Sequence, residues 1–322
     1  MTQAKHVQFD IGETFGIEEA KGAVINGHED TGSPFVPKAI NGYIHRRELL
    51  SDIIAWLKTG EGEGLLLVGP TGCGKTSGLT QVFAGLNWPT QRLTAHRRLE
   101  MADFTGHYTV IDGDMVFVDG PLVSAMRYGH AFLLDEMDML DPGVGASLNT
   151  VVEEGMVVIP ENGGEVVRAA PGFKFIATAN TAGNGDRTGL YQATLRQNAA
   201  FLDRFWVVEV DYPTVEQEAP ILASAAPSVP DWVRGKMIEV AGELRGLFIG
   251  ELDGPQIELP MSTRSLARWA RLTSTFQGVR KSGKDPVLHA LDRAFLNRAQ
   301  PETREAVHGI VARVIGDDVN FK

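Results

Sequence analysis

Hydrophobic residues gather in four short runs along the chain, and helix-length segments separate these runs. The runs are Leu65–Val68, Ala131–Leu134, Phe175–Ala179 and Trp206–Val210. Uninterrupted runs of this length are typical of strands that are buried on both faces of a parallel sheet. Their alternation with helix-length segments predicts an α/β fold with a doubly wound parallel sheet.

Helical spacing of apolar residues appears on both sides of these runs. Between residues 46 and 58 the apolar positions follow the spacing of an amphipathic helix. After Pro213 the strand-like runs stop, apart from one ambiguous stretch at 257–259. The expected helices there are 215–224, 230–248, 262–276, 285–298 and 302–315. The pattern therefore predicts three parts: an N-terminal arm or small subdomain (1–42), an α/β core (43–213) and a small all-helical lid (214–322).

Two insertions interrupt the predicted core. Residues 109–120 have strand-like halves around Asp112-Gly113, and residues 156–172 repeat this pattern around Asn162-Gly163-Gly164. Both are signals of β-hairpins.

Composition and net charge limit which partners and which kinds of site the protein is expected to have. The 322 residues carry 30 Lys and Arg against 41 Asp and Glu, a net charge of −11, which argues against a nucleic-acid partner. The single cysteine excludes a disulfide framework, and the scattered histidines predict no metal site built from protein ligands alone. Without a signal peptide or an apolar run of about 18 residues, the expectation is a soluble cytoplasmic protein with no membrane partner.

The segment GPTGCGKT at 69–76 matches the P-loop pattern G-x-x-x-x-G-K-[ST] between a predicted strand and a predicted helix. In such a loop backbone N–H groups surround the β-phosphate of a nucleotide. Lys75 is expected to reach the β- and γ-phosphates, and the Thr76 hydroxyl to ligate Mg²⁺. The alternative is a glycine-rich turn without a ligand. The predicted ATP-binding residues are Gly69, Pro70, Thr71, Gly72, Cys73, Gly74, Lys75, Thr76 and Ser77.

Acidic residues follow the second predicted strand. Asp135 ends this strand and is expected to hold Mg²⁺ with the nucleotide, while Glu136 is expected to polarise the attacking water. Asp138 and Asp141 are interpreted as helix N-caps or solvated carboxylates rather than catalytic groups.

Two further polar side chains are candidates for the same chemistry. Asn180 follows the third predicted strand and is expected to orient the water beside Glu136, the alternative being an ordinary turn residue. Arg204 precedes the fourth strand and is expected to reach the γ-phosphate of a neighbouring subunit, because a guanidinium stays charged and matches phosphate oxygens. The alternative for Arg204 is an ion pair with Asp203 or Asp211.

The predicted lid carries one candidate. Arg264 opens the expected helix 262–276 and is predicted to contact the γ-phosphate from within its own subunit. Arg268 and Arg271 on the same face are interpreted as a solvated surface.

The order of these motifs resembles the branch of AAA+ ATPases that has a helix-2 insert and a pre-sensor-1 hairpin. This branch holds the MoxR-type ATPases, their CbbQ and NorQ relatives and the chelatase motor subunits, and the sequence is most similar to CobS, the small subunits of aerobic cobaltochelatases. The stretches that carry the resemblance are 13–17, 85–89, 135–138, 177–181, 185–191, 202–204, 261–264 and 295–298.

The resemblance implies Glu136 as the hydrolytic base, Asn180 as sensor 1, Arg204 as the trans finger and Arg264 as sensor 2. It also implies a homo-hexameric ring that uses ATP and Mg²⁺ to remodel a partner carrying a von Willebrand A domain (CobT-like), as part of a cobalt chelatase-type complex. In such a ring, one hypothesis is that the hairpins 109–120 and 156–172 lie on one face or line the pore and move with the nucleotide state, and the alternative is passive packing between subunits. The alternatives are a MoxR-type chaperone for another metalloenzyme or assembly, a nucleic-acid-dependent translocase, and a nucleotide-gated binding module without turnover.

Overall fold

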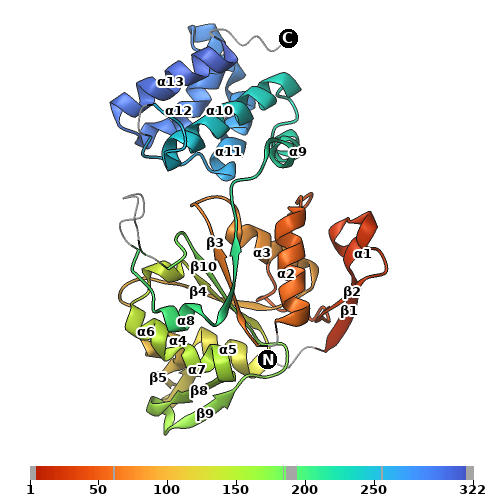
Figure 1. Ribbon diagram of the computed structural model, residues 1–322, viewed down its shortest axis with the longest axis vertical. Helices are drawn as coiled ribbons and strands as arrows, with labels where there is room; N and C mark the ends of the chain where they lie inside the picture. Colours follow the sequence, from red (N-terminus) through yellow and green to blue (C-terminus); the bar gives the residue numbers. More distant parts are fainter. Residues whose placement is uncertain (1–4, 61, 184, 186–193, 255–256, 317–322) are drawn as a thin grey trace. The chain divides into compact units, whose positions relative to one another are not determined.

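The computed structural model describes residues 5–60, 62–183, 185, 194–254 and 257–316. The chain forms two compact units (Figure 1). The first contains residues 1–41, 47–69 and 75–210, and the second contains residues 42–46, 70–74 and 211–322. The predicted domain boundaries at residues 42 and 213 stay predictions. In the described part of the chain, no helix is long and apolar enough to span a membrane.

A parallel sheet of five strands forms the centre of the first unit. Its order is β11-β3-β10-β7-β4, and every neighbouring pair is parallel. The strands are β3 (Gly64–Val68), β4 (Thr90–Thr94), β7 (Ala131–Asp135), β10 (Lys174–Ala179) and β11 (Phe205–Glu209). The predicted α/β fold with a doubly wound sheet is confirmed. The sequence runs missed β4, because TQRLT lies at the sheet edge and lacks an apolar run.

Helices cover both faces of this sheet (Figure 1). Right-handed crossovers place α3, between β3 and β4, and α5, between β4 and β7, on opposite faces. Helix α2 packs against α3, and α5 packs against β4 and β7. The helices of this unit are α1 (Ile11–Phe15), α2 (Arg47–Thr59), α3 (Lys75–Gly85), α4 (Met101–Thr105), α5 (Pro121–Tyr128), α6 (Pro142–Ser147), α7 (Asn149–Glu154) and α8 (Ala199–Leu202), with short 3₁₀ turns at η1 (Glu18–Ala20), η2 (Met137–Met139) and η3 (Pro160–Asn162).

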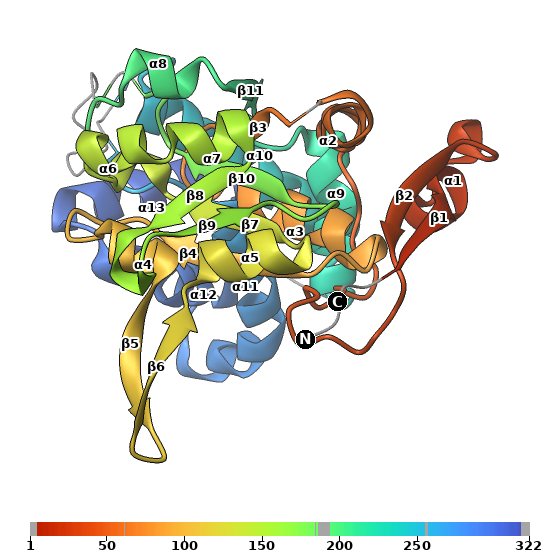
Figure 2. The ribbon, with the colours of Figure 1, turned by 90° about the horizontal axis from the view of Figure 1, so that it is seen from below.

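Both predicted hairpins are present. Strands β5 (Gly106–Ile111) and β6 (Asp114–Asp119) turn at Asp112-Gly113, whose backbones both have positive φ. Strands β8 (Met156–Ile159) and β9 (Glu165–Arg168) form the second hairpin. The β5–β6 hairpin projects from the sheet (Figure 2).

The N-terminal region is more regular than its weak apolar periodicity indicates. Strands β1 (His6–Asp10) and β2 (Val24–His28) pair antiparallel, with α1 in the connection between them. Asp10 caps α1 by accepting the Glu13 N–H at 2.9 Å. The predicted arm or small subdomain contains a short hairpin with one helix, and residues 1–41 belong to the first compact unit.

The second unit is helical outside the P-loop and residues 42–46. Its helices are α9 (Val215–Ala225), α10 (Asp231–Ile249), α11 (Thr263–Thr275), α12 (Pro286–Ala294) and α13 (Pro301–Ile315), with 3₁₀ turns η4 (Phe276–Ser282) and η5 (Leu296–Arg298). They match the five predicted helices. Their apolar faces enclose one core that includes Leu244, Trp269 and Leu291. The ambiguous stretch 257–259 forms no strand.

Candidate functional site

The predicted site residues of the first unit, except Arg204, lie at or just after the carboxyl ends of the parallel strands. Arg204 comes directly before β11 and its carbonyl accepts the N–H of Gly64, the first residue of β3, so it lies at the opposite end of these strands. Register pairs Val68 of β3 with Ala179 of β10, and Asp135 of β7 with Thr94 of β4. The loops that follow such strands leave from one edge of the sheet, which is where ligands bind in open α/β folds.

Lys75, the first residue of α3, is 8% exposed. Its ammonium group donates to the Gly69 carbonyl at 2.6 Å and to Asn180 Oδ1 at 3.1 Å. The P-loop lysine and the predicted sensor 1 are thus in direct contact.

Asp135 is the centre of a second polar cluster. Its Oδ1 accepts the Thr76 hydroxyl at 2.9 Å and also the Thr178 hydroxyl. Its Oδ2 pairs with the Arg92 guanidinium, which compensates the charge of a side chain that is only 9% exposed. The Thr76 hydroxyl and the Asp135 carboxylate are oxygen ligands of the kind that Mg²⁺ prefers, and their separation lets them serve one ion.

Glu136 directly follows β7 and has a left-handed backbone, with φ 57° and ψ 42°. Such a conformation costs a residue other than glycine about 1–2 kcal/mol. Its N–H donates to the Thr178 hydroxyl at 3.1 Å, and its side chain is exposed. The left-handed turn thus places an exposed acidic residue directly after Asp135.

Asp138 is fully buried, so its interpretation as a solvated carboxylate or helix N-cap is wrong. Its Oδ2 accepts the backbone N–H groups of Asn180 at 2.9 Å and Thr181 at 3.0 Å. Burial raises the pKa of Asp138, because its effect is larger than that of these hydrogen bonds, which lower the pKa. Asp138 therefore fixes the backbone that carries Asn180. Asp141 does cap a helix, because it accepts the Gly143 N–H at 2.8 Å.

Arg204 follows α8 and forms an ion pair within its own subunit. Its guanidinium contacts Glu153 Oε2 at 2.5 Å and 3.0 Å and donates to the Ala200 carbonyl. The partner is a residue of α7 rather than Asp203 or Asp211. Because Glu153 is 58% exposed, the pair lies at the surface, where ion pairs are weak and easily exchanged.

Arg264 lies exposed in the first turn of α11. Ser262 caps this helix by accepting the Ser265 N–H at 3.1 Å. In the second unit, a side chain added to Gly72 of the P-loop would overlap with Ser262. The beginning of α11 and the P-loop are therefore in close contact.

Two family descriptions match the chain. An AAA domain (dynein-related subfamily) matches residues 64–198, and the CbbQ/NirQ/NorQ C-terminal family matches residues 218–314. Protein NorQ of Paracoccus denitrificans (strain Pd 1222) is 30% identical over 247 residues, covering 76% of this chain and 86% of that protein. Aerobic cobaltochelatase subunit CobS of Sinorhizobium sp is 30% identical over 294 residues, covering 88% and 84%. The chain belongs to the AAA+ family, in the group of NorQ and CobS.

The predicted resemblance to this AAA+ group is confirmed. A third relative of this chain is von Willebrand factor A domain-containing protein 8 of Mus musculus. It is 32% identical over 217 residues, which are 64% of this chain and 11% of that protein. AAA+ proteins generally use ATP and Mg²⁺. Part of the stretch behind the resemblance, residues 186–191, lies outside the described residues.

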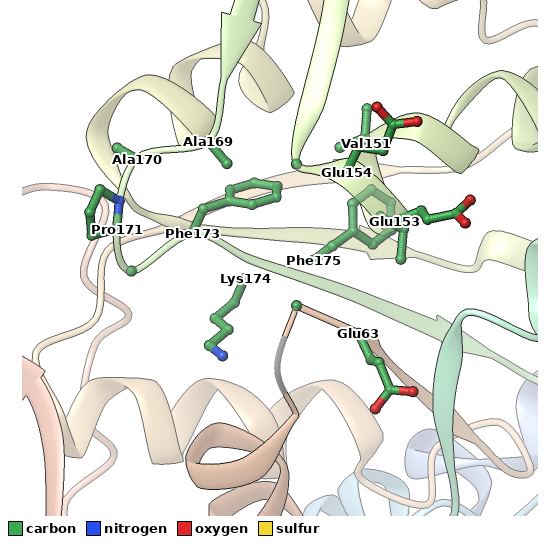
Figure 3. A pocket seen from close by; sticks show the side chains of 14 residues that line it. Glu63, Val151, Glu153, Glu154, Ala169, Ala170, Pro171, Phe173, Lys174 and Phe175 are labelled. Atoms are coloured by element: carbon green, nitrogen blue, oxygen red, sulfur yellow. The ribbon is translucent and has the colours of Figure 1, made fainter.

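Two hollows in the described part of the chain lie away from the site. One of about 430 Å³ lies beside α7 and the start of β10, with Glu63, Glu153 and Lys174 in its lining (Figure 3). It adjoins the end of β10 opposite to Asn180. The convergence of polar groups, rather than the size of a cavity, identifies the site.

Sequence reasoning missed three residues of this site. Thr178 lies inside the apolar run 175–179, and a hydroxyl inside a buried strand is the signal that could have revealed it. Arg92 lies on β4, the strand that the pattern did not predict. The sequence neighbours of Asp138 do not indicate its role, because its partners lie 42 and 43 residues away.

Proposed function

We propose that this chain hydrolyses ATP with Mg²⁺ as one subunit of a homo-hexameric ring and uses the cycle to remodel a partner protein. One observation carries the proposal. Lys75 contacts Asn180, and Thr76 contacts Asp135, across 105 and 59 residues of sequence. Motifs that are far apart in the chain meet where a nucleotide's phosphates and its metal ion would bind.

The P-loop, residues 69–77, would surround the phosphates, and Lys75 would exchange the Gly69 carbonyl for phosphate oxygens. Thr76 and Asp135 would hold Mg²⁺, which when bound neutralises charge on the β- and γ-phosphates. Glu136, whose carboxylate has no hydrogen-bond partner among the described residues, would polarise the attacking water, and Asn180 would orient it. We propose domain boundaries near residues 42 and 213, which would separate the N-terminal arm, the ATPase core and the helical lid.

Two arginines complete the proposed site. Arg204 would leave Glu153 and reach the γ-phosphate of the neighbouring subunit. Arg264 would act as sensor 2 from the start of α11, and the close approach of Ser262 to Gly72 supports this role.

For the client, we propose a CobS-like role as the ATPase subunit of a cobalt chelatase-type complex. The 30% identity to CobS over 88% of this chain supports it. A partner with a von Willebrand A domain fits, since a relative carries that domain in its name. We propose a cytoplasmic location, where a chain with a single cysteine is ordinary.

A MoxR-type chaperone that matures another metalloenzyme is the second candidate, because the C-terminal match is to the CbbQ/NirQ/NorQ family. Neighbouring genes separate the two: a corrin-pathway chelatase subunit favours the first, and an unrelated metalloenzyme operon favours the second. The net charge of −11 disfavours a nucleic-acid-dependent translocase.

Nucleotide binding tests the proposal directly. We expect the wild-type chain to bind the non-hydrolysable analogue Mg·AMP-PNP, and Lys75→Ala to bind it about 10- to 100-fold more weakly, since a charged hydrogen bond contributes about 1.5–3 kcal/mol. Titration calorimetry measures both. Lys58→Ala, an exposed lysine on α2, is the matched control and should bind as the wild type does. Equal affinities for all three chains would contradict the phosphate site.

The two hairpins would engage the client as one body. Arg127 on α5 pairs with Asp119 of β6 at 2.8 Å and with Glu165 of β9 at 2.7 Å. In addition, the Tyr108 hydroxyl of β5 donates to Asn162 Oδ1 at 3.0 Å. These contacts join the hairpins, so that a movement of one would be transmitted to the other.

Arg127→Met should loosen both hairpins together. We expect faster amide hydrogen exchange over residues 106–119 and 156–168, because the shared cation is lost. Arg168→Met, which removes an exposed charge on β9 that has no ion pair among the described residues, is the control and should leave exchange unchanged. Faster exchange in only one hairpin would show that they are not joined through Arg127.

A further inference from the structure

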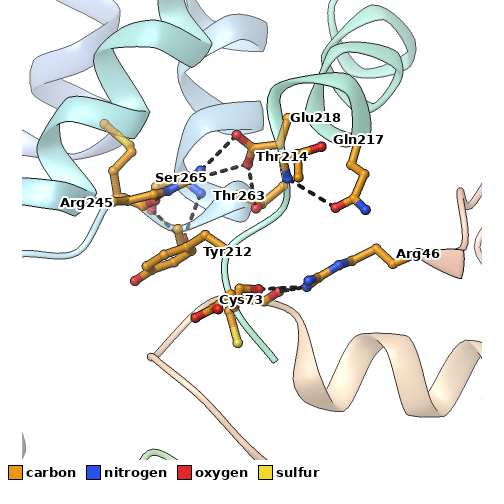
Figure 4. Close-up of polar contacts among 12 residues, drawn as sticks. Arg46, Cys73, Tyr212, Thr214, Gln217, Glu218, Arg245, Thr263 and Ser265 are labelled. Carbon is orange, nitrogen blue, oxygen red and sulfur yellow. Dashed lines mark hydrogen bonds and ion pairs between the residues drawn. The ribbon is translucent and has the colours of Figure 1, made fainter. Parts of the chain in front are cut away.

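Two side chains of the second unit donate hydrogen bonds to carbonyl groups of the P-loop, and Figure 4 shows one of them, Arg46 beside Cys73. The Tyr212 hydroxyl donates to the Thr71 carbonyl at 3.0 Å. Arg46 Nη1 donates to the Cys73 carbonyl at 3.2 Å and to the Asp211 carbonyl at 2.8 Å. Two alternate peptide groups of the loop interior are therefore fixed from outside.

Fixing a carbonyl also fixes the next N–H. In a planar trans peptide, the carbonyl of one residue and the N–H of the following residue point in opposite directions. A donor on the Thr71 carbonyl thus turns the Gly72 N–H to the opposite side, and a donor on the Cys73 carbonyl does the same for Gly74. N–H groups of a P-loop are the groups that surround the phosphates.

Glycine leaves these peptide planes more conformational freedom than another residue would. Gly72 and Gly74 have φ of 78° and 101°, a region that glycine enters readily but does not prefer over others. Without a constraint, both peptide planes could rotate and turn their N–H groups away from a phosphate. The two donors contribute to such a constraint.

Tyr212 is itself held in place by buried charged groups. The Arg245 guanidinium lies 4.6 Å from the centre of the tyrosine ring. Arg245 makes two hydrogen bonds to Glu218, at 2.9 Å and 2.8 Å, and a third to the Met261 carbonyl at 2.7 Å. Because the side chains of Arg245 and Glu218 are 7% and 1% exposed, the pair is shielded from solvent and keeps one geometry.

The same pair reaches the first residue of α11. Glu218 Oε1 also accepts the Thr263 hydroxyl at 2.7 Å. A continuous set of contacts therefore runs from the Thr71 carbonyl through Tyr212, Arg245 and Glu218 to the residue before Arg264.

We propose that Tyr212 and Arg46 are positioning residues that orient the Gly72 and Gly74 N–H groups toward the phosphates of a bound nucleotide, with the Arg245–Glu218 pair holding Tyr212. This inference rests on the proposed nucleotide function. It assigns the control of phosphate affinity to residues that do not themselves touch the nucleotide.

Tyr212→Phe tests the proposal, because it removes the hydroxyl and keeps the ring that Arg245 covers. We expect the Kd for Mg·ADP to rise about three- to tenfold, the effect of one lost hydrogen bond, with an unchanged melting temperature. Mg·IDP, which differs from Mg·ADP only in its base, should lose affinity by the same factor. Tyr128→Phe at the end of α5 is the matched control and should bind both as the wild type does.

Arg46→Met provides a second variant. It keeps an unbranched side chain, removes the donor to the Cys73 carbonyl and should also weaken binding of both nucleotides equally. If both variants bind with wild-type affinity, the proposal is overturned. It is also overturned if the affinities for ADP and IDP fall by different factors, because that would mean a contact with the base. If the wild-type chain binds neither nucleotide, the proposed function fails as well. If the wild-type chain binds and only Lys75→Ala is weakened, this inference alone fails.

Discussion

Glu136→Gln should lower the rate of ATP hydrolysis by about 10²- to 10⁴-fold while leaving nucleotide binding intact. Glutamine keeps the size of the side chain, and the exposed position after β7 tolerates it. The amide cannot take a proton from water, so only the chemical step is affected. ATP should accumulate on the protein and hold the ring in its assembled state.

Light scattering after size exclusion measures that assembly. With Mg·ATP, we expect the Glu136→Gln chain to have the mass of about six subunits of 35.0 kDa each. Glu48→Gln, which changes an exposed carboxylate on α2, should hydrolyse ATP as the wild type does. A Glu136→Gln chain that stays monomeric with bound ATP would contradict a ring that forms by itself, and one that retains hydrolysis would exclude Glu136 as the base.

Arg204→Ala should lower hydrolysis by about 10³-fold or more, as expected for the loss of an arginine finger. Binding of Mg·AMP-PNP should stay unchanged, because the guanidinium is proposed to act on the neighbour's γ-phosphate. The ion pair to Glu153 lies at the surface, so its loss should cost at most about 1 kcal/mol of folding stability. A steady-state ATPase assay and a thermal unfolding curve measure both effects.

Mixing the two inactive chains decides whether Arg204 acts in trans. In a mixed ring, some interfaces join an Arg204→Ala subunit, which keeps Glu136, to a Glu136→Gln subunit, which keeps Arg204. Such an interface contains both groups. We therefore expect the mixture to recover part of the wild-type activity. A mixture that stays inactive, although it forms rings, would indicate that Arg204 acts within its own subunit or has only a structural role.

Sequence by itself determined the parts of this protein whose signals are local. The P-loop is recognisable because its residues act together within one loop, and the runs at 65–68, 131–134, 175–179 and 206–210 all became strands of the parallel sheet. Helical spacing placed the five helices after residue 214, and Asp-Gly and Asn-Gly signals placed the hairpins. Membership in the AAA+ group also followed from the order of these motifs.

Tertiary structure alone decided which groups meet. Strand β4 is polar enough to escape the apolar pattern, and only pairing with β7 brings Arg92 to Asp135. Asp138 looked like a solvated carboxylate, yet folding buries it against the end of β10. The physical reason is that burial and hydrogen-bond partners depend on residues dozens of positions away. The apolar pattern records which face of an element is buried, but it does not record which polar group lies opposite.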